Sequence, residues 1–356
     1  MTSLGGRKSA LAILAALGGS LLAWAGLLTA CTAQAHHDAT SPSQHPSRSA
    51  GTATAHVAVR LGTIGTFAVR KRGMTIIEPA HPGVTGASLP ARRLLTEVYY
   101  PLTGPAPAAA TAHAKGPLPM LVFAPGFMQC AAPYSRLLRA WASAGYLVVV
   151  VNFPLSDCKV GAAATESDMV NQPGDMSFVI SRMLALSAAG HGFFSGLIDP
   201  HEIAISGQSD GGDTVAAIAA NTCCANRRVA AVAVLSGAEW PPMPGQYFAH
   251  HPVPMLFTQG SADTINPPGC SVTMYRADPD VERHYLDLIG ASHTVPYWGT
   301  NRYERVVARV TTAFFDRYVL GGKKAGQAMR RSGNVPGLAV LYNDGDGQFP
   351  STYCNT

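Results

Sequence analysis

Charged residues are scarce in this sequence. Aspartate, glutamate, lysine and arginine make up only 13% of its 356 residues, and the net charge of +5 is spread along the chain without a basic block. Chains that bind nucleic acids concentrate lysine and arginine in patches, so a nucleic-acid partner is not expected. The sequence also has no internal repeat, and its length fits one large α/β domain or two smaller ones.

Metal-binding patterns are missing as well. There is no Cys-x-x-Cys or His-x-x-x-His spacing, so neither a metal nor another cofactor is expected. Apart from Cys31, an even number of cysteines remains, which in an exported protein favours disulfides, with 15 pairings open. Because Cys223 and Cys224 are adjacent, we expect each to pair with a different partner. The six cysteines are Cys130, Cys158, Cys223, Cys224, Cys270 and Cys354.

The N-terminus carries a targeting segment. Arg7 and Lys8 precede an uncharged apolar run over residues 10–30. The run ends in Leu-Thr-Ala followed by Cys31, which resembles the bacterial lipoprotein signal; that resemblance implies cleavage before Cys31 and its lipidation, and hence a membrane partner. An uncleaved anchor helix and an ordinary cleaved signal remain alternatives, and all three imply export. Residues 1–30 are thus predicted to be a signal and 31–55 a flexible tether.

The remaining chain alternates between strand and helix patterns. With 47% hydrophobic residues it can bury a large core, and strands apolar on both faces are typical of a parallel sheet covered by helices. We therefore predict an α/β fold, with a mostly parallel central sheet and helices on both faces. One domain is predicted over 56–320 and a C-terminal extension, tied down by Cys354, over 321–356. Strands are expected near 56–70 and at 93–100, 119–124, 146–151, 202–206, 230–235, 253–258, 284–288 and 337–342, and helices at 134–145, 175–188, 213–220 and 302–320.

One stretch organises the rest, the sequence Gly-Gln-Ser-Asp-Gly-Gly over residues 207–212. It follows a predicted strand and precedes a predicted helix, the setting in which Gly-x-Ser-x-Gly forms a nucleophile elbow. The serine of such an elbow has a strained backbone, so its neighbours must be nearly free of side chains. Ser209 is therefore the candidate nucleophile.

A serine nucleophile needs a histidine base and an acid that orients the base. When the serine lies on this kind of elbow, the acid and then the histidine follow it along the chain. Asp263 comes directly after a predicted strand and His293 after the next one, where sites on parallel sheets collect. The competing residues are weaker candidates. His250 and His251 come before the strand that leads to the acid, which is the wrong order. His284 opens a strand, and Asp278 and Asp280 lie in a polar loop.

The oxyanion formed during acyl transfer needs two N–H donors. The backbone amide of Asp210 would supply one. That of Phe127 would supply the other, from a loop that follows a predicted strand and in which Gly126 lets substrate approach the backbone.

These segments together resemble the α/β-hydrolase superfamily, and within it the bacterial cutinase-like polyester hydrolases and the platelet-activating-factor-acetylhydrolase and dienelactone-hydrolase-like group. The resemblance implies the α/β-hydrolase fold, a Ser-His-Asp mechanism without cofactor, and an acyl site lined by Trp240. Cutinase-like elbows carry His and Met where this chain has Gln208 and Asp210, and Ser209 in place of cysteine argues against dienelactone hydrolysis. The segments that carry the resemblance are 124–127, 207–212, 263–267 and 290–293.

The function expected from the sequence is a secreted or lipid-anchored serine carboxylic-ester hydrolase acting on small or polymeric esters. Acyl transfer or peptide cleavage with the same triad is an alternative. A non-catalytic surface lipoprotein that keeps the fold as a binding module is another, although no triad residue is missing.

Overall fold

A nine-stranded sheet runs through the computed structural model, which describes residues 64–102, 117–249, 253–279 and 282–343. All of these residues belong to one compact unit. The predictions for the signal, the tether, Cys31 and Cys354 lie outside the described residues. Within the described part of the chain, no helix is long and apolar enough to cross a membrane.

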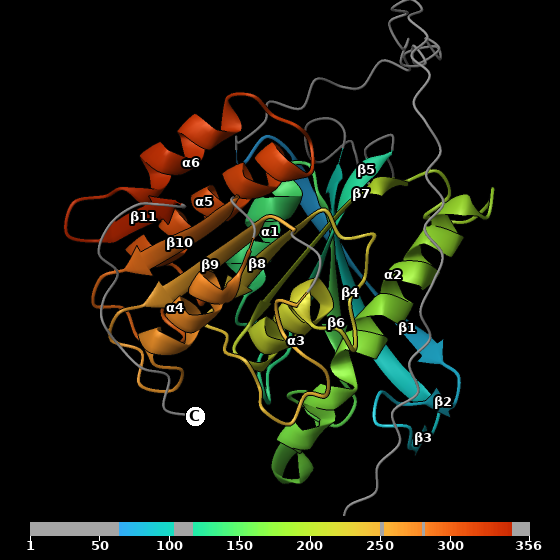
Figure 1. Cartoon of the computed structure of the whole chain (residues 1–356). Helices are drawn as coiled ribbons and strands as arrows, with labels where there is room; N and C mark the ends of the chain where they lie inside the picture. Colours follow the sequence, from blue (N-terminus) through green and yellow to red (C-terminus); the bar gives the residue numbers. More distant parts are fainter. Residues whose placement is uncertain (1–63, 103–116, 250–252, 280–281, 344–356) are drawn as a thin grey trace, which may run out of the picture. The chain divides into compact units, whose positions relative to one another are not determined.

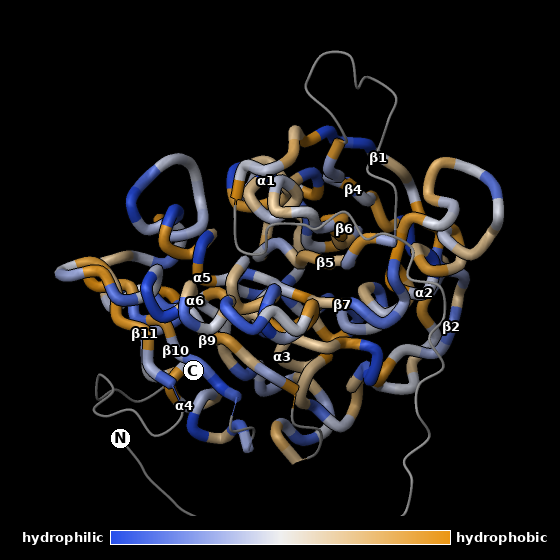
Figure 2. The backbone as a smooth tube through the Cα atoms, turned by 90° about the horizontal axis from the view of Figure 1, so that it is seen from above, coloured by the Kyte–Doolittle hydropathy of each residue, from blue (hydrophilic) through white to orange (hydrophobic). Residues whose placement is uncertain are grey.

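The sheet is mostly parallel, as predicted. Its strand order is β1-β4-β6-β5-β7-β8-β9-β10-β11, with parallel pairing from β6 to β10 and antiparallel pairing at both ends. β1 and β11 therefore lie at opposite ends of the sheet (Figure 2). The strands are β1 (Ala68–Glu78), β4 (Arg92–Leu102), β5 (Leu118–Ala124), β6 (Leu147–Asn152), β7 (Ile198–Gln208), β8 (Ala231–Leu235), β9 (Met255–Gly260), β10 (Arg283–Leu288) and β11 (Ala339–Asn343); β2 (His81–Pro82) and β3 (Ser88–Leu89) form a separate hairpin.

Helices cover both faces of the sheet, as predicted (Figure 1). Successive strand residues point to opposite faces, so Val149 and Val151 of β6 join the core under α2, α3 and α4, while Val148 and Val150 join the core under α1, α5 and α6. Such strands must be apolar throughout. The helices are α1 (Ser135–Ser143), α2 (Gln172–Ala188), α3 (Asp210–Ala220), α4 (Pro268–Ala277), α5 (Arg302–Tyr318) and α6 (Ala325–Gly333), with the 3₁₀ turns η1 (Gly161–Ala163) and η2 (Glu166–Val170).

Several elements differ from the sequence prediction: α6 and the two 3₁₀ turns were not predicted, and β7 begins earlier than expected. β1 runs to Glu78, beyond the predicted strand near 56–70, because an edge strand exposes one face and tolerates charged residues such as Lys71 and Arg72. α4 was not predicted, since its proline and serine residues hide the helical pattern. The strand predicted over 337–342 is present as β11, which pairs with β10 while α6 packs against α5. Residues 325–343 therefore complete one end of the sheet.

A buried ion cluster joins β4 to η2 and α2. Arg92 donates hydrogen bonds to both carboxylate oxygens of Asp168 at 2.9 Å, and to those of Asp175 at 2.6 and 2.7 Å. All three side chains are buried. Burial lowers the pKa of the Arg92 guanidinium, but the hydrogen bonds to Asp175 and Asp168 outweigh this and leave it raised.

Replacement of Arg92 by methionine is expected to lower the free energy of unfolding by about 3–5 kcal/mol, because two buried carboxylates lose their countercharge. Chemical denaturation measures the loss. The matched control is Arg93→Met, an exposed neighbour on the same strand, which should change stability by about 0.5 kcal/mol or less. Equal effects of the two substitutions would contradict a stabilising role for the cluster.

The disulfides correct one prediction. Cys130 pairs with Cys158, joining the loop after β5 to the loop after β6. Cys223 and Cys224 pair with each other, so the expectation that they take different partners was wrong. Cys130 and Cys158 are bonded to each other, and Cys270 is also in a disulfide. These three cysteines are therefore not free to pair with Cys223 or Cys224.

Loss of the Cys130–Cys158 disulfide is expected to destabilise the fold by roughly 3–4 kcal/mol. The bridge spans 28 residues, and closing a loop of that length restricts the unfolded chain by about this amount. Urea denaturation of the double variant Cys130→Ser/Cys158→Ser against the parent chain measures it. An unchanged midpoint would contradict the expectation.

Candidate active site

Ser209 lies between the end of β7 and the start of α3 with φ 56° and ψ −127°. This left-handed conformation is strained for a residue with a side chain. Neighbouring elements hold it in place, because the Ser209 amide donates to Leu235 O of β8 and Ser209 O accepts from Asp213 N, both at 3.0 Å. The side chain stays half-exposed, so the strained turn presents a hydroxyl at the carboxyl end of the sheet.

Two glycines of the elbow are required by close packing. A Cβ on Gly207 would lie 2.0 Å from Gly211 O, and a Cβ on Gly211 would lie 2.0 Å from Ala124 O. No side chain fits at either distance. The turn can therefore be this sharp only with glycine at both positions.

Asp263 and His293 are brought together from the loops after β9 and β10. His293 Nδ1 lies 2.8 Å from Asp263 Oδ2. Asp263 is 4% exposed, and its Oδ1 accepts hydrogen bonds from the backbone amides of Ile265 and Asn266 at 2.9 and 3.0 Å. The carboxylate is thus fixed against the imidazole, the arrangement by which an acid orients a base.

A second layer of side chains orients that carboxylate. Gln259 Nε2 donates to Asp263 Oδ2 at 2.8 Å, and Gln259 Oε1 accepts from the Ser271 hydroxyl at 2.6 Å. Ser271 belongs to α4 and is fully buried. The helix that the sequence pattern missed therefore supports the acid.

Gln208, rather than Ser209, contacts the other nitrogen of His293. Gln208 Nε2 lies 3.2 Å from His293 Nε2, and among the described residues no hydrogen bond joins the Ser209 hydroxyl to His293. Gln208 Oε1 accepts from the Tyr134 hydroxyl at 2.7 Å, which in turn accepts from Gly126 N at 3.2 Å.

The direction of this network assigns the histidine tautomer. Since Gln208 Oε1 accepts from Tyr134, its amide nitrogen faces His293 as a donor. The imidazole then accepts at Nε2 and donates from Nδ1 to Asp263, which is the tautomer a general base requires. In the sequence, Gln208 stands out only as a difference from cutinase-like elbows. Tyr134 was not predicted as part of the site, because its only signal in the sequence is an aromatic residue at the start of a predicted helix.

The loop after β5 lies directly against the elbow. A Cβ on Gly126 would approach Ser209 Cβ and Gln208 O to 3.1 Å. Among the described residues, neither the Phe127 amide nor the Asp210 amide donates to a main-chain carbonyl. Both predicted oxyanion donors therefore lie on the two segments that flank Ser209, and the Asp210 amide also interacts with its own carboxylate.

The Asp210 side chain is buried beside these donors. It is 6% exposed, and its Oδ2 has no hydrogen-bond partner within the described part of the chain. Burial and the negative charge of Glu166 raise the pKa of Asp210 to about 7, against the opposing influence of its own backbone amide and of His293. Its charge therefore changes near neutral pH.

Trp240 follows β8, as predicted, and is half-buried. It packs against the small buried cluster that contains Met243, and it lines a cavity of about 470 Å³. Ser209, Asp263 and His293 are not among the residues lining that cavity. The structure therefore does not join Trp240 to the triad residues.

No protein-family model matches the chain, and no curated protein matches it either. Within the described residues, no three histidine, cysteine, aspartate or glutamate side chains converge to hold a metal ion. A functional assignment has to rest on the geometry around Ser209.

Proposed function

We propose that this protein is an exported serine carboxylic-ester hydrolase with an α/β-hydrolase fold. The observation that carries the proposal is the strained Ser209 between β7 and α3, together with the Asp263–His293 pair. Asp263 lies on the loop after β9 and His293 on the loop after β10. A sheet that places these loops at the carboxyl ends of parallel strands supports the fold assignment.

The proposed reaction proceeds through an acyl-enzyme. Ser209 Oγ attacks the ester carbonyl while His293 Nε2 accepts the hydroxyl proton, and this proton passes to the leaving alcohol as the C–O bond breaks. Water then gives a proton to the same imidazole as it attacks the acyl carbon, and the acid leaves as Ser209 regains its proton. The Phe127 and Asp210 amides bind the oxyanion in both steps.

This mechanism requires one rearrangement. His293 Nε2 has to exchange the Gln208 amide for the Ser209 hydroxyl. The two donors belong to consecutive residues, and the proposal requires the imidazole or the Gln208 side chain to rotate so that Nε2 reaches the Ser209 hydroxyl. Asp263 holds Nδ1 throughout.

Labelling by a fluorophosphonate probe tests the proposal. The parent chain is expected to be labelled covalently, because only an activated serine attacks such a probe. Ser209→Ala should abolish the label. The matched control is Ser206→Ala, which removes a buried strand serine hydrogen-bonded to Ala233 O. An unlabelled but folded parent chain would instead favour a non-catalytic binding module.

The location is part of the proposal. Residues 1–30 act as a signal, and Cys31 carries the lipid that holds the enzyme at the membrane. Metabolic labelling with an alkyne fatty acid should mark the parent chain and leave Cys31→Ser unmarked. Release of both chains into the medium without label would favour an ordinary secreted enzyme.

A further inference from the structure

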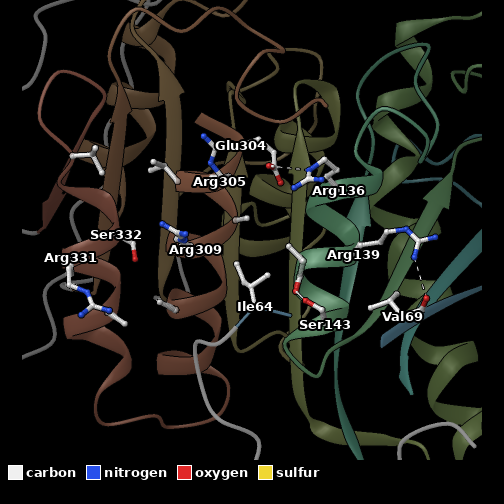
Figure 3. A pocket seen from close by; sticks show the side chains of 16 residues that line it. Ile64, Val69, Arg136, Arg139, Ser143, Glu304, Arg305, Arg309, Arg331 and Ser332 are labelled. Carbon is white, nitrogen blue, oxygen red and sulfur yellow. Dashed lines mark hydrogen bonds and ion pairs between the residues drawn. The ribbon is translucent and has the colours of Figure 1, made fainter. Parts of the chain in front are cut away.

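A second hollow lies away from the triad, between α1, α5 and α6. Its volume is about 980 Å³, and Ser209, Asp263 and His293 are not among its lining residues. Figure 3 shows arginines around it from all three helices, with Ile64 between α5 and α1. We call it the arginine groove; its cations are Arg136, Arg139, Arg305, Arg309 and Arg331.

The positive charge of the arginine groove is largely uncompensated. Among the described residues that line it, Glu304 is the only acidic one, and its Oε2 lies 3.6 Å from Arg136 Nε. In the part of the chain that the structure describes, the side chains of Arg305, Arg309 and Arg331 make no hydrogen bond or ion pair, and all three residues are exposed; Arg305 acts on Glu304 only at longer range. The whole sequence has only 26 lysines and arginines, so five around one hollow is a marked concentration.

The spacing of the arginines on α5 costs helix stability, whereas Arg136 pairs with Glu304 and Arg139 donates to Val69 O. Arg305 and Arg309 lie four residues apart on α5, where side chains of like charge face each other and repel. Arg136 and Arg139 lie three apart on α1. A bound anion would offset this repulsion, and arginine forms paired hydrogen bonds with phosphate oxygens.

Between the arginines the lining includes small aliphatic side chains, among them Ile64, Val306, Ala313 and Val335. Two serines, Ser143 and Ser332, also line the groove. A hollow of this volume is at the upper end of the range for small-molecule sites, which are mostly apolar with a few placed polar groups. The combination fits an amphiphile with an anionic head.

We propose that the arginine groove binds an anionic phospholipid, with the phosphate on the arginines and an acyl chain along the aliphatic part of the lining. The position of Ile64 favours a membrane lipid over a free anion. Ile64 lines the groove and follows the proposed anchor Cys31 by 33 residues, so a lipid-anchored chain keeps the groove within the reach of a flexible linker from the membrane surface. The inference goes beyond ester hydrolysis and uses the proposed function only for the anchor.

Native mass spectrometry of the full chain, released from neutral maltoside micelles, tests the proposal. Dioleoyl phosphatidylglycerol is compared with dioleoyl phosphatidylcholine, which has the same acyl chains and no net charge. We expect adducts with the anionic lipid at concentrations at least tenfold lower. The triple variant Arg305→Gln/Arg309→Gln/Arg331→Gln should weaken that binding about a hundredfold, at roughly fivefold per arginine.

The matched control removes three exposed arginines elsewhere, as Arg93→Gln/Arg182→Gln/Arg227→Gln, and should bind as the parent chain does. Equal binding of the two lipids, or equal loss in both triple variants, would overturn the proposal. Oleate binding without phosphatidylglycerol binding would also overturn it, in favour of a carboxylate ligand. Should the groove variant not fold, Arg309→Gln alone carries the test with an expected fivefold loss. Catalysis is not measured, so failure here leaves the esterase proposal intact.

Discussion

Alanine at Ser209 is expected to lower kcat for p-nitrophenyl acetate by at least about four orders of magnitude, with little change in KM. Without the hydroxyl no acyl-enzyme forms, and only binding and the oxyanion donors remain to accelerate hydrolysis. His293→Ala should cost a similar factor, because the two residues act as one unit. Initial rates above the spontaneous hydrolysis of the ester measure both.

The double variant Ser209→Ala/His293→Ala separates this mechanism from general damage. Residues that act together give losses that do not multiply, so the double variant should be about as slow as either single one. Independent losses would contradict the triad. His284→Ala is the control, since His284 of β10 bonds to Tyr318 of α5 and to Asn343 of β11 and should leave kcat nearly unchanged.

Asp210→Asn is expected to raise activity at alkaline pH. The pKa of Asp210 is raised to about 7, first by burial and then by Glu166, so above neutrality the wild-type carboxylate is charged beside the oxyanion. Two like charges on the order of 6–8 Å apart repel by about 2 kcal/mol at an effective dielectric of 20, roughly thirtyfold in rate. Wild-type kcat should therefore fall as pH rises through about 7, and the asparagine variant should lack this fall.

The same substitution should stabilise the fold, with a defined pH dependence. The Asp210 pKa is about 7 when folded against 3.8 as the ordinary value. The folded state thus binds the proton more tightly, and stability is lost as pH rises from about 4 to 7. Relative to wild type, Asp210→Asn should gain up to about 4 kcal/mol at pH 8 and almost nothing at pH 4. Denaturation at both pH values checks this.

Glu166→Gln provides the control for both Asp210 measurements. Glu166 is exposed on η2, and its negative charge raises the pKa of Asp210. Its removal should move the alkaline fall in kcat to lower pH without abolishing it. An identical pH profile in all three proteins would show that Asp210 does not govern the fall.

The parallel centre of the sheet was predictable from the sequence because its strands are buried on both faces. Runs such as 146–151 are apolar at every position, and β6 lies there. The edge strand β1 was less predictable, since it has one exposed face and carries charge. The Cys223–Cys224 pairing depends on where the other cysteines lie, which no local pattern records.

The candidate site likewise has parts that the sequence predicts and parts that it does not. Asp263 and His293 were found because each follows a buried strand, and strand ends collect at one edge of a parallel sheet. Gln208 and Tyr134 bond each other across 74 positions in the sequence, so their partnership exists only in the folded chain. The burial of Asp210, which determines its charge, is likewise a tertiary property.

The glycine packing at the elbow has a consequence for directed evolution of this protein. Positions 207 and 211 have backbone atoms where any larger residue would place its first carbon, so libraries randomised there should yield almost only glycine among active clones. Diversity for new esters has to enter through the loops after β5, β8, β9 and β10. A screen that varies those loops and holds the two glycines fixed would search only sequences that can still form the turn.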